Sequence, residues 1–130
     1  MCRIFISADP RSYASRTRSV RLHGAVTSIR LENLYWHVLD EIARRDGMTV
    51  VQLIERLYDE LVQERGAAGN FTSFLRVCAL RYEALMAHGC IPLDTAVPIR
   101  SLNPDAGQDP VGELDVWHRG GPTLSTRLSQ

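Results

Sequence analysis

The chain has 130 residues, of which 45% are apolar and 23% charged, and its 15 arginines balance 15 acidic residues. This length predicts one domain with a modest core. No run approaches the roughly 18 consecutive apolar residues of a membrane span, and the N-terminal arginines are not followed by the apolar segment of a secretory signal. The cytoplasm is therefore the expected compartment.

The three cysteines are an odd number without a CxxC spacing, so neither a disulfide framework nor a common zinc motif is indicated. A zinc site built from Cys78, His88, Cys90 and Cys2 matches no usual ligand spacing, and packing of Cys78 inside a helix is the favoured interpretation. We expect neither a metal ion nor a cofactor.

Charge is distributed unevenly along the chain, although its sum is zero. Residues 1–30 contain six arginines against one aspartate, a net charge of +5, whereas residues 31–66 contain eight acidic residues against four arginines, a net charge of −4. All basic residues are arginine, whose planar fork suits bidentate contacts to guanine or phosphate. A basic N-terminal part on an acidic body can orient the protein toward phosphates.

Residues 1–24 are predicted to form an N-terminal basic arm. The segment Arg3-Ile4-Phe5-Ile6 is apolar and β-prone, and Asp9-Pro10 favours a turn. From Arg16 to His23 apolar and polar residues alternate in an extended pattern, and Gly24 permits a bend. Two interpretations of residues 16–23 stay open, and they are compatible. The segment reaches along a phosphate backbone or into a groove, or it is a strand that shields the edge of the strand after it.

The segment Thr27-Ser28-Ile29-Arg30-Leu31 is predicted to be a short β-strand that stands alone before a helical region. An unpaired strand needs a partner for its backbone groups, and we expect the same strand of a second copy, paired antiparallel about a two-fold axis. Ile29 and Leu31 would pack on the helices. Ser28 and Arg30 would project outward from a two-stranded ribbon whose width suits the DNA major groove.

Two helices are predicted next. The first spans residues 33–46 and carries the apolar stripe Tyr35, Val38, Leu39 and Ile42, flanked by Trp36 and Ala43, with Gly47 as its stop. The second begins at Thr49, because Thr49-Val50-Val51-Gln52 has the pattern of a capping box. Its apolar positions then keep helical spacing for nearly four turns: Val50, Leu53, Ile54, Leu57, Tyr58 and Leu61.

A third helix is predicted after the break Gly66-Ala67-Ala68-Gly69, with Asn70 as its cap and Gly89 at its end. Its apolar stripe comprises Phe71, Phe74, Leu75, Cys78, Tyr82, Leu85 and Met86. This stripe either enlarges the core of a dimer, the favoured interpretation, or forms a docking face for an effector protein. Residues 90–130 are punctuated by proline and are predicted to be an irregular or disordered tail.

The order strand, helix, turn through Gly47, helix resembles the ribbon-helix-helix class of DNA-binding proteins. Five motifs within residues 1–90 make the chain similar to one bacterial subfamily of this class. These are Met1-Cys2-Arg3-Ile4-Phe5, Thr17-Arg18-Ser19-Val20-Arg21-Leu22, Thr27-Ser28-Ile29-Arg30-Leu31-Glu32, Asp46-Gly47-Met48-Thr49 and Gly69-Asn70-Phe71-Thr72-Ser73. The resemblance implies a mainly α fold that forms an intertwined homodimer with an intersubunit two-stranded antiparallel ribbon. The ribbon-helix-helix domain would span residues 25–89 and include a third helix beyond the minimal fold.

The implied function is sequence-specific binding of double-stranded DNA, with Val26, Ser28 and Arg30 facing base edges. Contacts to phosphates are expected from the arm and from the start of the second helix, where free N–H groups and the dipole attract anions. These residues are Arg16, Arg18, Arg21, His23, Thr49 and Val50. A transcriptional regulator that binds DNA as a homodimer, or as a pair of dimers, is the leading interpretation. The alternative is a dimeric interaction module or antitoxin-like regulator that acts through the third helix and tail.

An enzyme is not expected. The sequence has no Gly-rich phosphate loop, no HExxH and no Gly-x-Ser-x-Gly motif. The four histidines are scattered over different predicted elements, and His37 falls outside the main apolar stripe of its helix, which is typical of a solvated side chain. Asp40 and Glu41 are adjacent and therefore lie on different helix faces.

Overall fold

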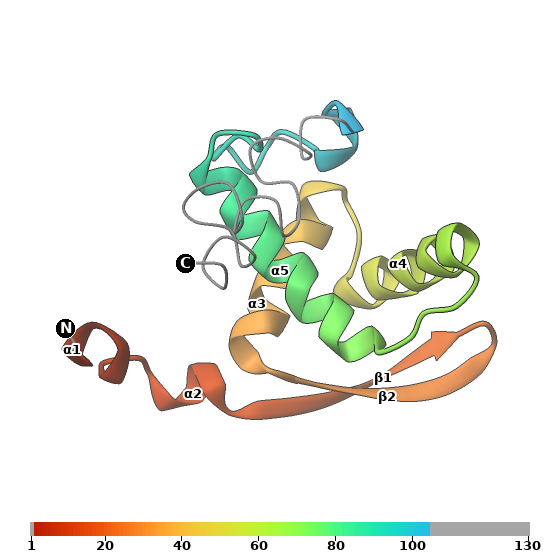
Figure 1. Ribbon diagram of the computed structural model, residues 1–130, viewed down its shortest axis with the longest axis horizontal. Coiled ribbons are helices and arrows are strands. Elements are labelled where there is room, and N and C mark those ends of the chain that lie inside the picture. The colour runs from red at the N-terminus through yellow and green to blue at the C-terminus, as the bar shows by residue number, and fades with distance from the viewer. Residues whose placement is uncertain (1, 105–130) are drawn as a thin grey trace, which may run out of the picture. The chain divides into compact units, whose positions relative to one another are not determined.

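The structure is a computed structural model that describes residues 2–104. Its elements in chain order are α1 (Cys2–Ile6), α2 (Pro10–Tyr13), β1 (Ser15–Leu22), β2 (Ala25–Glu32), α3 (Asn33–Arg45), α4 (Val50–Arg65), α5 (Phe71–Ala87) and a 3-10 turn, Ile99–Ser101. The chain divides into two compact units, Met1–Ala79 and Leu80–Gln130. The first contains both strands, the helices up to α4 and the first half of α5 (Figure 1).

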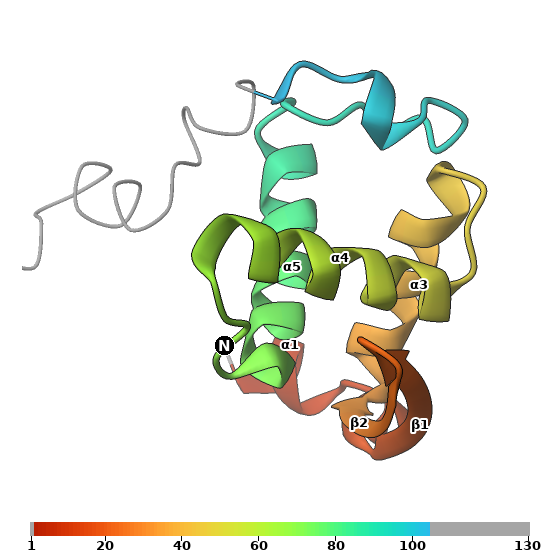
Figure 2. The ribbon, with the colours of Figure 1, turned by 90° about the vertical axis from the view of Figure 1, so that its right-hand side faces the viewer.

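The two strands form an antiparallel hairpin within one chain. Its register pairs Ser15 with Glu32 at the open end and Leu22 with Ala25 at the turn. The two turn residues both have positive φ, 49° at His23 and 82° at Gly24. Positive φ at both central residues is the requirement of a type I′ turn, whose twist matches that of the flanking strands of a two-residue hairpin. Figures 1 and 2 show the hairpin along one side of α3 and α4.

This hairpin corrects one expectation. The structure has two eight-residue strands rather than one short strand, because the alternating residues of the predicted basic arm supply β1. Of the two interpretations of residues 16–23, the structure shows the strand beside the main strand. Pairing with a second copy was expected because the main strand had no predicted partner in its own chain. In the structure, β1 pairs with one edge of β2, so that edge needs no second copy.

The N-terminal segment also differs from expectation. Residues 2–6 form the short helix α1 rather than an extended, β-prone segment, and every one of them is exposed. Residues with β propensity need a ladder to pair with, and among the described residues no strand lies beside them. Local bonds take over instead, such as the 3.1 Å bond from the Ser7 N–H to the Arg3 carbonyl.

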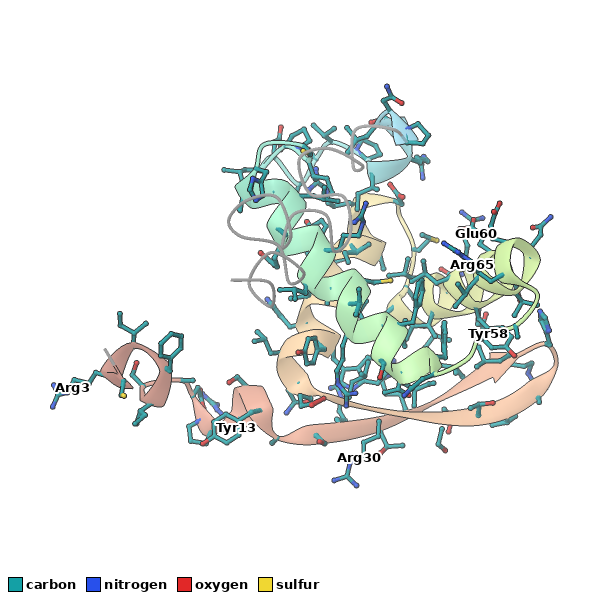
Figure 3. The ribbon with its side chains drawn as sticks, in the orientation of Figure 1. Arg3, Tyr13, Arg30, Tyr58, Glu60 and Arg65 are labelled. Carbon is teal, nitrogen blue, oxygen red and sulfur yellow. The ribbon has the colours of Figure 1, made fainter. Side chains whose placement is uncertain are left out.

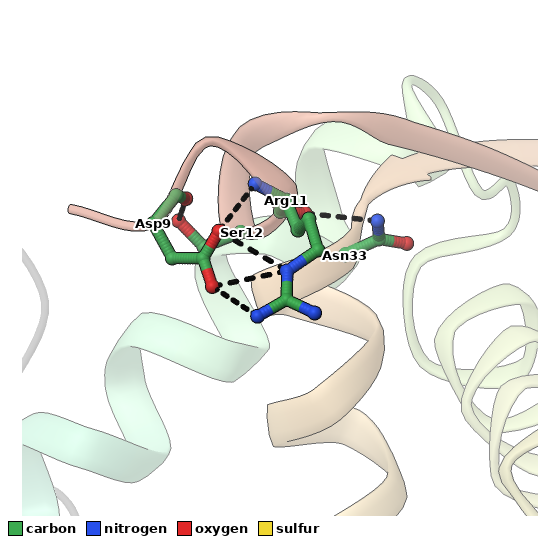
Figure 4. Close-up of polar contacts among 4 residues, drawn as sticks. All are labelled: Asp9, Arg11, Ser12 and Asn33. Carbon is green, nitrogen blue, oxygen red and sulfur yellow. Dashed lines mark hydrogen bonds and ion pairs between the residues drawn. The ribbon is translucent and has the colours of Figure 1, made fainter.

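Helix α2 is anchored at both sides by polar contacts (Figure 4). The Asp9 carboxylate caps it by accepting from the Arg11 backbone N–H at 2.9 Å, and it also accepts two bonds from Arg11 Nε and one from Nη2. These contacts with Arg11 lower the pKa of Asp9 and raise the pKa of Arg11. The Arg11 carbonyl accepts from Asn33 Nδ2 at 2.9 Å, which fixes α2 beside the first residue of α3.

Alternation along the hairpin divides its side chains between an inner and an outer face. The inner face packs against the helices through Val20 (3% exposed), Leu22 (8%), Ile29 (3%) and Leu31 (0%). The prediction that Ile29 and Leu31 point into the core is thereby confirmed. Arg16 and Arg18 share this alternation but lie beyond the apolar residues, toward the open end of the hairpin.

The helices α3, α4 and α5 confirm the ribbon-helix-helix order with an additional third helix. In α3 the most deeply buried residues are Trp36 (2% exposed), Leu39 and Ala43 (both 0%), so the buried stripe is rotated slightly from the expected one, toward Trp36. The Trp36 Nε1–H donates to the Arg16 carbonyl at 2.8 Å. This bond satisfies the buried indole and fixes β1 to α3.

In the first unit, α5 is joined to the other elements by aromatic and ionic contacts. Edge-to-face contacts link His23 to Tyr58 at 5.0 Å and Tyr58 to Phe71 at 5.2 Å between ring centroids. Arg76 forms an ion pair with Glu32, with Nη2 3.0 Å from Oε1. The backbone N–H of Glu32 and the Arg76 guanidinium lower the pKa of Glu32. Such a half-exposed pair contributes up to about 1 kcal/mol.

The second unit begins within α5. Its Tyr82, Leu85 and Ile91 side chains are buried, at 3%, 8% and 8% exposure. Beyond Gly89 (φ +76°), the backbone N–H groups of Cys90 and Ile91 both bond to the Leu85 carbonyl. The chain beyond α5 is irregular as far as it is described, apart from the 3-10 turn. The predicted tail beyond residue 104 lies outside the described residues.

We expect the core to depend on Leu39. Replacing Leu39, which is fully buried, by Ala should lower the free energy of unfolding by about 2–5 kcal/mol, because the substitution removes buried methyl groups and leaves a cavity. Leu34→Ala is the matched control on the same helix, since Leu34 is 54% exposed, and it should change stability by no more than about 0.5 kcal/mol. Urea denaturation of both variants measures the difference, and equal losses would contradict this core assignment.

Candidate nucleic-acid interface

The outer face of the hairpin is formed by residues on both strands, in three cross-strand pairs. The register places Thr17 opposite Arg30, Ser19 opposite Ser28, and Arg21 opposite Val26. All six side chains are exposed, with Val26 at 66%. Because antiparallel partners point to the same side of a sheet, these residues form one polar surface opposite the buried face.

The three residues predicted to face bases therefore lie together. Val26, Ser28 and Arg30 alternate along β2 on the outer face, and Figure 3 shows Arg30 pointing away from the helices. The structure adds Thr17 and Ser19 of β1, which sequence reasoning did not single out. Their signal was present in the alternation of residues 16–23, once that segment is interpreted as a strand paired with β2.

Arg16 and Arg18 occupy a different position from Arg30. Both guanidinium groups stack over Trp36, with the Cζ atoms 5.9 and 5.7 Å from its ring centroid. They line an open depression of about 740 Å³ between α2, β1 and α3, which also includes Arg11, His37 and Asp40. Cation–π contacts of this kind hold the two side chains at the margin of the hairpin, where charge remains accessible to solvent.

Arg21 belongs to the outer face, although it was predicted among the arm residues. Its Nη1 donates to the Gly24 carbonyl at 3.2 Å, which leaves most of its five N–H donors for other partners. Its backbone N–H lies outside the ladder and donates to Glu55 Oε1 of α4 at 3.4 Å. The outer edge of β1 is thus turned toward α4.

His23 is bound to α4. Its Nε2 lies 3.0 Å from Asp59 Oδ1, and its ring packs edge-on against Tyr58. With Glu55, two acidic residues of α4 therefore contact the turn end of the hairpin. Some of the acidic residues of the helical body therefore contact the basic N-terminal part within the fold and position the turn.

The start of α4 has the predicted capping box. Thr49 Oγ1 accepts from the Gln52 N–H at 3.2 Å, and Gln52 Oε1 accepts from the Thr49 N–H at 2.9 Å. The Thr49 side chain is exposed, whereas Val50 is 4% exposed and packs in the core. Val50 can therefore offer a ligand only its backbone N–H. The cap explains the precise start of the helix with or without a ligand.

Within residues 2–104 no three His, Cys, Asp or Glu residues are grouped so as to hold a metal ion. No helix there is long and apolar enough to cross a membrane. The cysteines Cys2, Cys78 and Cys90 form no disulfide with one another.

The order of strand β2 and helices α3 and α4 is that of a ribbon-helix-helix protein. A model of the ribbon-helix-helix domain matches residues 15–83, and the chain belongs to this family. It is also similar to the solved structure of an uncharacterized protein from Bordetella pertussis Tohama I, with 65% sequence identity and a TM-score of 0.83. That similarity covers 85% of this chain and 89% of the other. No curated protein matches this chain.

We expect the cap of α4 to contribute measurably to stability. Thr49→Ala removes the acceptor for the Gln52 N–H and should cost about 1 kcal/mol of unfolding free energy. Thr49→Ser keeps a hydroxyl at the same position and should retain most of that stability. Chemical denaturation of the two variants provides the test, and an equal loss in both would show that the methyl group, not the cap, matters.

Proposed function

We propose that this protein binds double-stranded DNA in a sequence-specific manner and regulates transcription in the bacterial cytoplasm. The observation that carries the proposal is the outer face of the hairpin, where exposed Ser28 and Arg30 lie directly opposite a buried apolar face. A two-stranded ribbon fits the major groove, and an arginine fork makes the commonest specific contact there, to guanine O6 and N7. Membership of the ribbon-helix-helix family supports the same function.

Affinity would come from residues around this face. Arg16 and Arg18, held over Trp36 at the margin of the hairpin, are proposed to contact phosphates, whose neutralisation releases counterions. The start of α4 at Thr49 and Val50 is proposed to contribute backbone N–H groups to a phosphate. His23 is proposed to assist from the turn, although Asp59 already engages it.

We further propose that the protein acts as a homodimer. The family supports pairing of two chains, and α1 presents a cluster of exposed apolar side chains, with Ile4 77%, Phe5 71% and Ile6 79% exposed. Apolar groups gathered in this way are typical of an interaction site. If stability depends on dimerisation, the melting temperature should rise with protein concentration. Sedimentation that shows a well-folded monomer at micromolar concentration would contradict the dimer.

One observation favours a second function, an interaction module that acts through α5. Val77 and Leu80 on this helix are 57% and 62% exposed, outside the stripe that includes buried Phe71 and Leu75. Exposed aliphatic residues on a long helix suit a helical protein partner. The DNA experiment below separates the two functions, because an interaction module needs no selectivity among duplexes.

Base discrimination should depend on Arg30. Duplexes selected from a random library by the purified protein supply the specific site. Arg30→Ala should bind that site about 1–3 kcal/mol more weakly, and random duplex almost normally, because a base-specific hydrogen bond forms only where the correct base is present. Arg44→Ala is the matched control, since Arg44 is an exposed arginine of the helical body paired with Asp40, and it should bind both duplexes normally.

Replacing Arg16 and Arg18 together should give a different result. Binding to selected and random duplex should weaken alike, and the slope of log affinity against log salt should flatten by about 0.9 for each phosphate that is no longer neutralised. Titrations at several salt concentrations measure both quantities. If the wild type selects no sequence, or if Arg30→Ala binds the selected site normally, the hairpin is not the reading element and the interaction module gains support.

A further inference from the structure

The open depression between α2, β1 and α3 is lined by two arginines whose charge is not balanced. Its volume is about 740 Å³, within the range of pockets that bind small molecules. Arg16 and Arg18 reach it from β1, and within residues 2–104 neither guanidinium group forms an ion pair. Uncompensated positive charge at a concave surface attracts anions, so the depression has the character of an anion site.

The two carboxylates of the depression are already engaged by other arginines. Asp9 accepts hydrogen bonds from Nε and Nη2 of Arg11 (Figure 4). Asp40 is paired with Arg44, whose Nη2 lies 2.6 Å from Oδ2. Because each acidic charge is balanced by its own arginine, neither carboxylate compensates the two guanidinium groups that come from β1.

Both of these guanidinium groups lie on the inner side of the hairpin, away from Arg30. In the register Arg16 lies opposite Leu31, which is fully buried. Arg18 lies opposite Ile29, which is 3% exposed. Antiparallel partners point to the same side of a sheet, so the depression opens on the side opposite the outer face. A ligand can therefore occupy it without covering the residues proposed to face bases.

Packing holds the site in place before a ligand binds. The Cζ atoms of Arg16 and Arg18 lie 5.9 and 5.7 Å from the ring centroid of Trp36, and the indole is itself fixed by its bond to the Arg16 carbonyl. The wall formed by α2 is joined to α3 through Asn33. Donors that are already positioned lose less freedom on binding, which favours affinity.

We propose that this depression binds a small molecule that carries a phosphate monoester, and that the bound ligand keeps Arg16 and Arg18 from the phosphates of DNA. A phosphate monoester carries a charge of about −1.5 to −2 at pH 7, which matches the two uncompensated guanidinium groups. The arginine fork also fits phosphate oxygens bidentately. Ligand binding requires no DNA, and only the competition rests on the proposed DNA binding.

The first test measures ligand binding without DNA. Calorimetric titration of the full-length protein with adenosine monophosphate or inorganic phosphate should show saturable binding, whereas adenosine, which lacks the phosphate, should not bind. Arg16→Ala and Arg18→Ala should each weaken binding roughly 2- to 5-fold, as for a solvent-accessible charge pair, and replacing both should leave no saturable binding. Arg56→Ala removes an exposed arginine of α4 outside the depression and should bind like wild type.

Arg18→Lys separates loss of the site from loss of the fold. It keeps the charge and an aliphatic stem over Trp36 but lacks the fork, so it should fold and bind with intermediate affinity. The proposal is wrong if wild type binds neither phosphate compound, if adenosine binds as well as adenosine monophosphate, or if the folded double variant binds normally. In each case the arginines only cover the indole.

The second test adds DNA. At constant ionic strength, adenosine monophosphate should weaken the binding of random duplex by wild type, and adenosine should not. The double variant Arg16→Ala/Arg18→Ala should show no such effect. If the ligand binds in the first test but leaves duplex affinity unchanged, the competition is wrong and the depression stays a phosphate site. A wild type that binds no duplex would contradict the proposed function, and the competition with it, without changing the result of the first test.

Discussion

The structure depends on the antiparallel pairing of β1 with β2, because this pairing assigns each side chain of the hairpin to one of two faces. Backbone bonds fix the register, and a shift of one residue would exchange the faces. Val20, Leu22, Ile29 and Leu31 are buried under that register. Burial of these four apolar side chains thus holds Ser28 and Arg30 outward, so the energy of the core also determines what the protein presents to a ligand.

The helical body supports the hairpin with contacts of two kinds. Apolar packing comes from α3, where Trp36 also binds the Arg16 carbonyl and underlies two guanidinium groups. Acidic residues of α4 supply the second kind, through Glu55 and Asp59 at the turn end. Neither kind is a strong interaction by itself. Because they act at opposite ends of β1, they restrain the hairpin along its whole length.

Sequence reasoning predicted the features that depend on local chemistry. The capping box at Thr49, the stop at Gly47 and the cap at Asn70 were all predicted, since each is set by a few neighbouring residues. The outward direction of Ser28 and Arg30 followed from alternation alone. The ribbon-helix-helix order with a third helix was predicted from these signals together with the family resemblance, and was confirmed.

The errors concern pairing, which local chemistry does not determine. The main strand was predicted to pair with the same strand of a second copy, whereas in the structure β1 pairs with β2 across a two-residue turn. Positive φ at His23, a residue with a side chain, made that turn harder to foresee than an Asn-Gly turn. The prediction that Arg16, Arg18 and Arg21 contact phosphates stays a prediction, but the structure gives these residues different positions. Alternation places Arg21 on the other face, and only the position of Trp36 shows what the first two contact.

A ribbon assembled within one chain has a different energetic character from one shared by two chains. A shared ribbon forms only when two chains meet, so its population depends on protein concentration. A hairpin closed by two residues is formed at an effective concentration set by its own turn, so its outer face exists before any partner arrives. Separate strands also allow the two halves of the outer face to differ in sequence, as Thr17 and its cross-strand partner Arg30 do. A shared ribbon of identical strands must keep its two halves alike, whereas the two strands of this hairpin can change independently of each other.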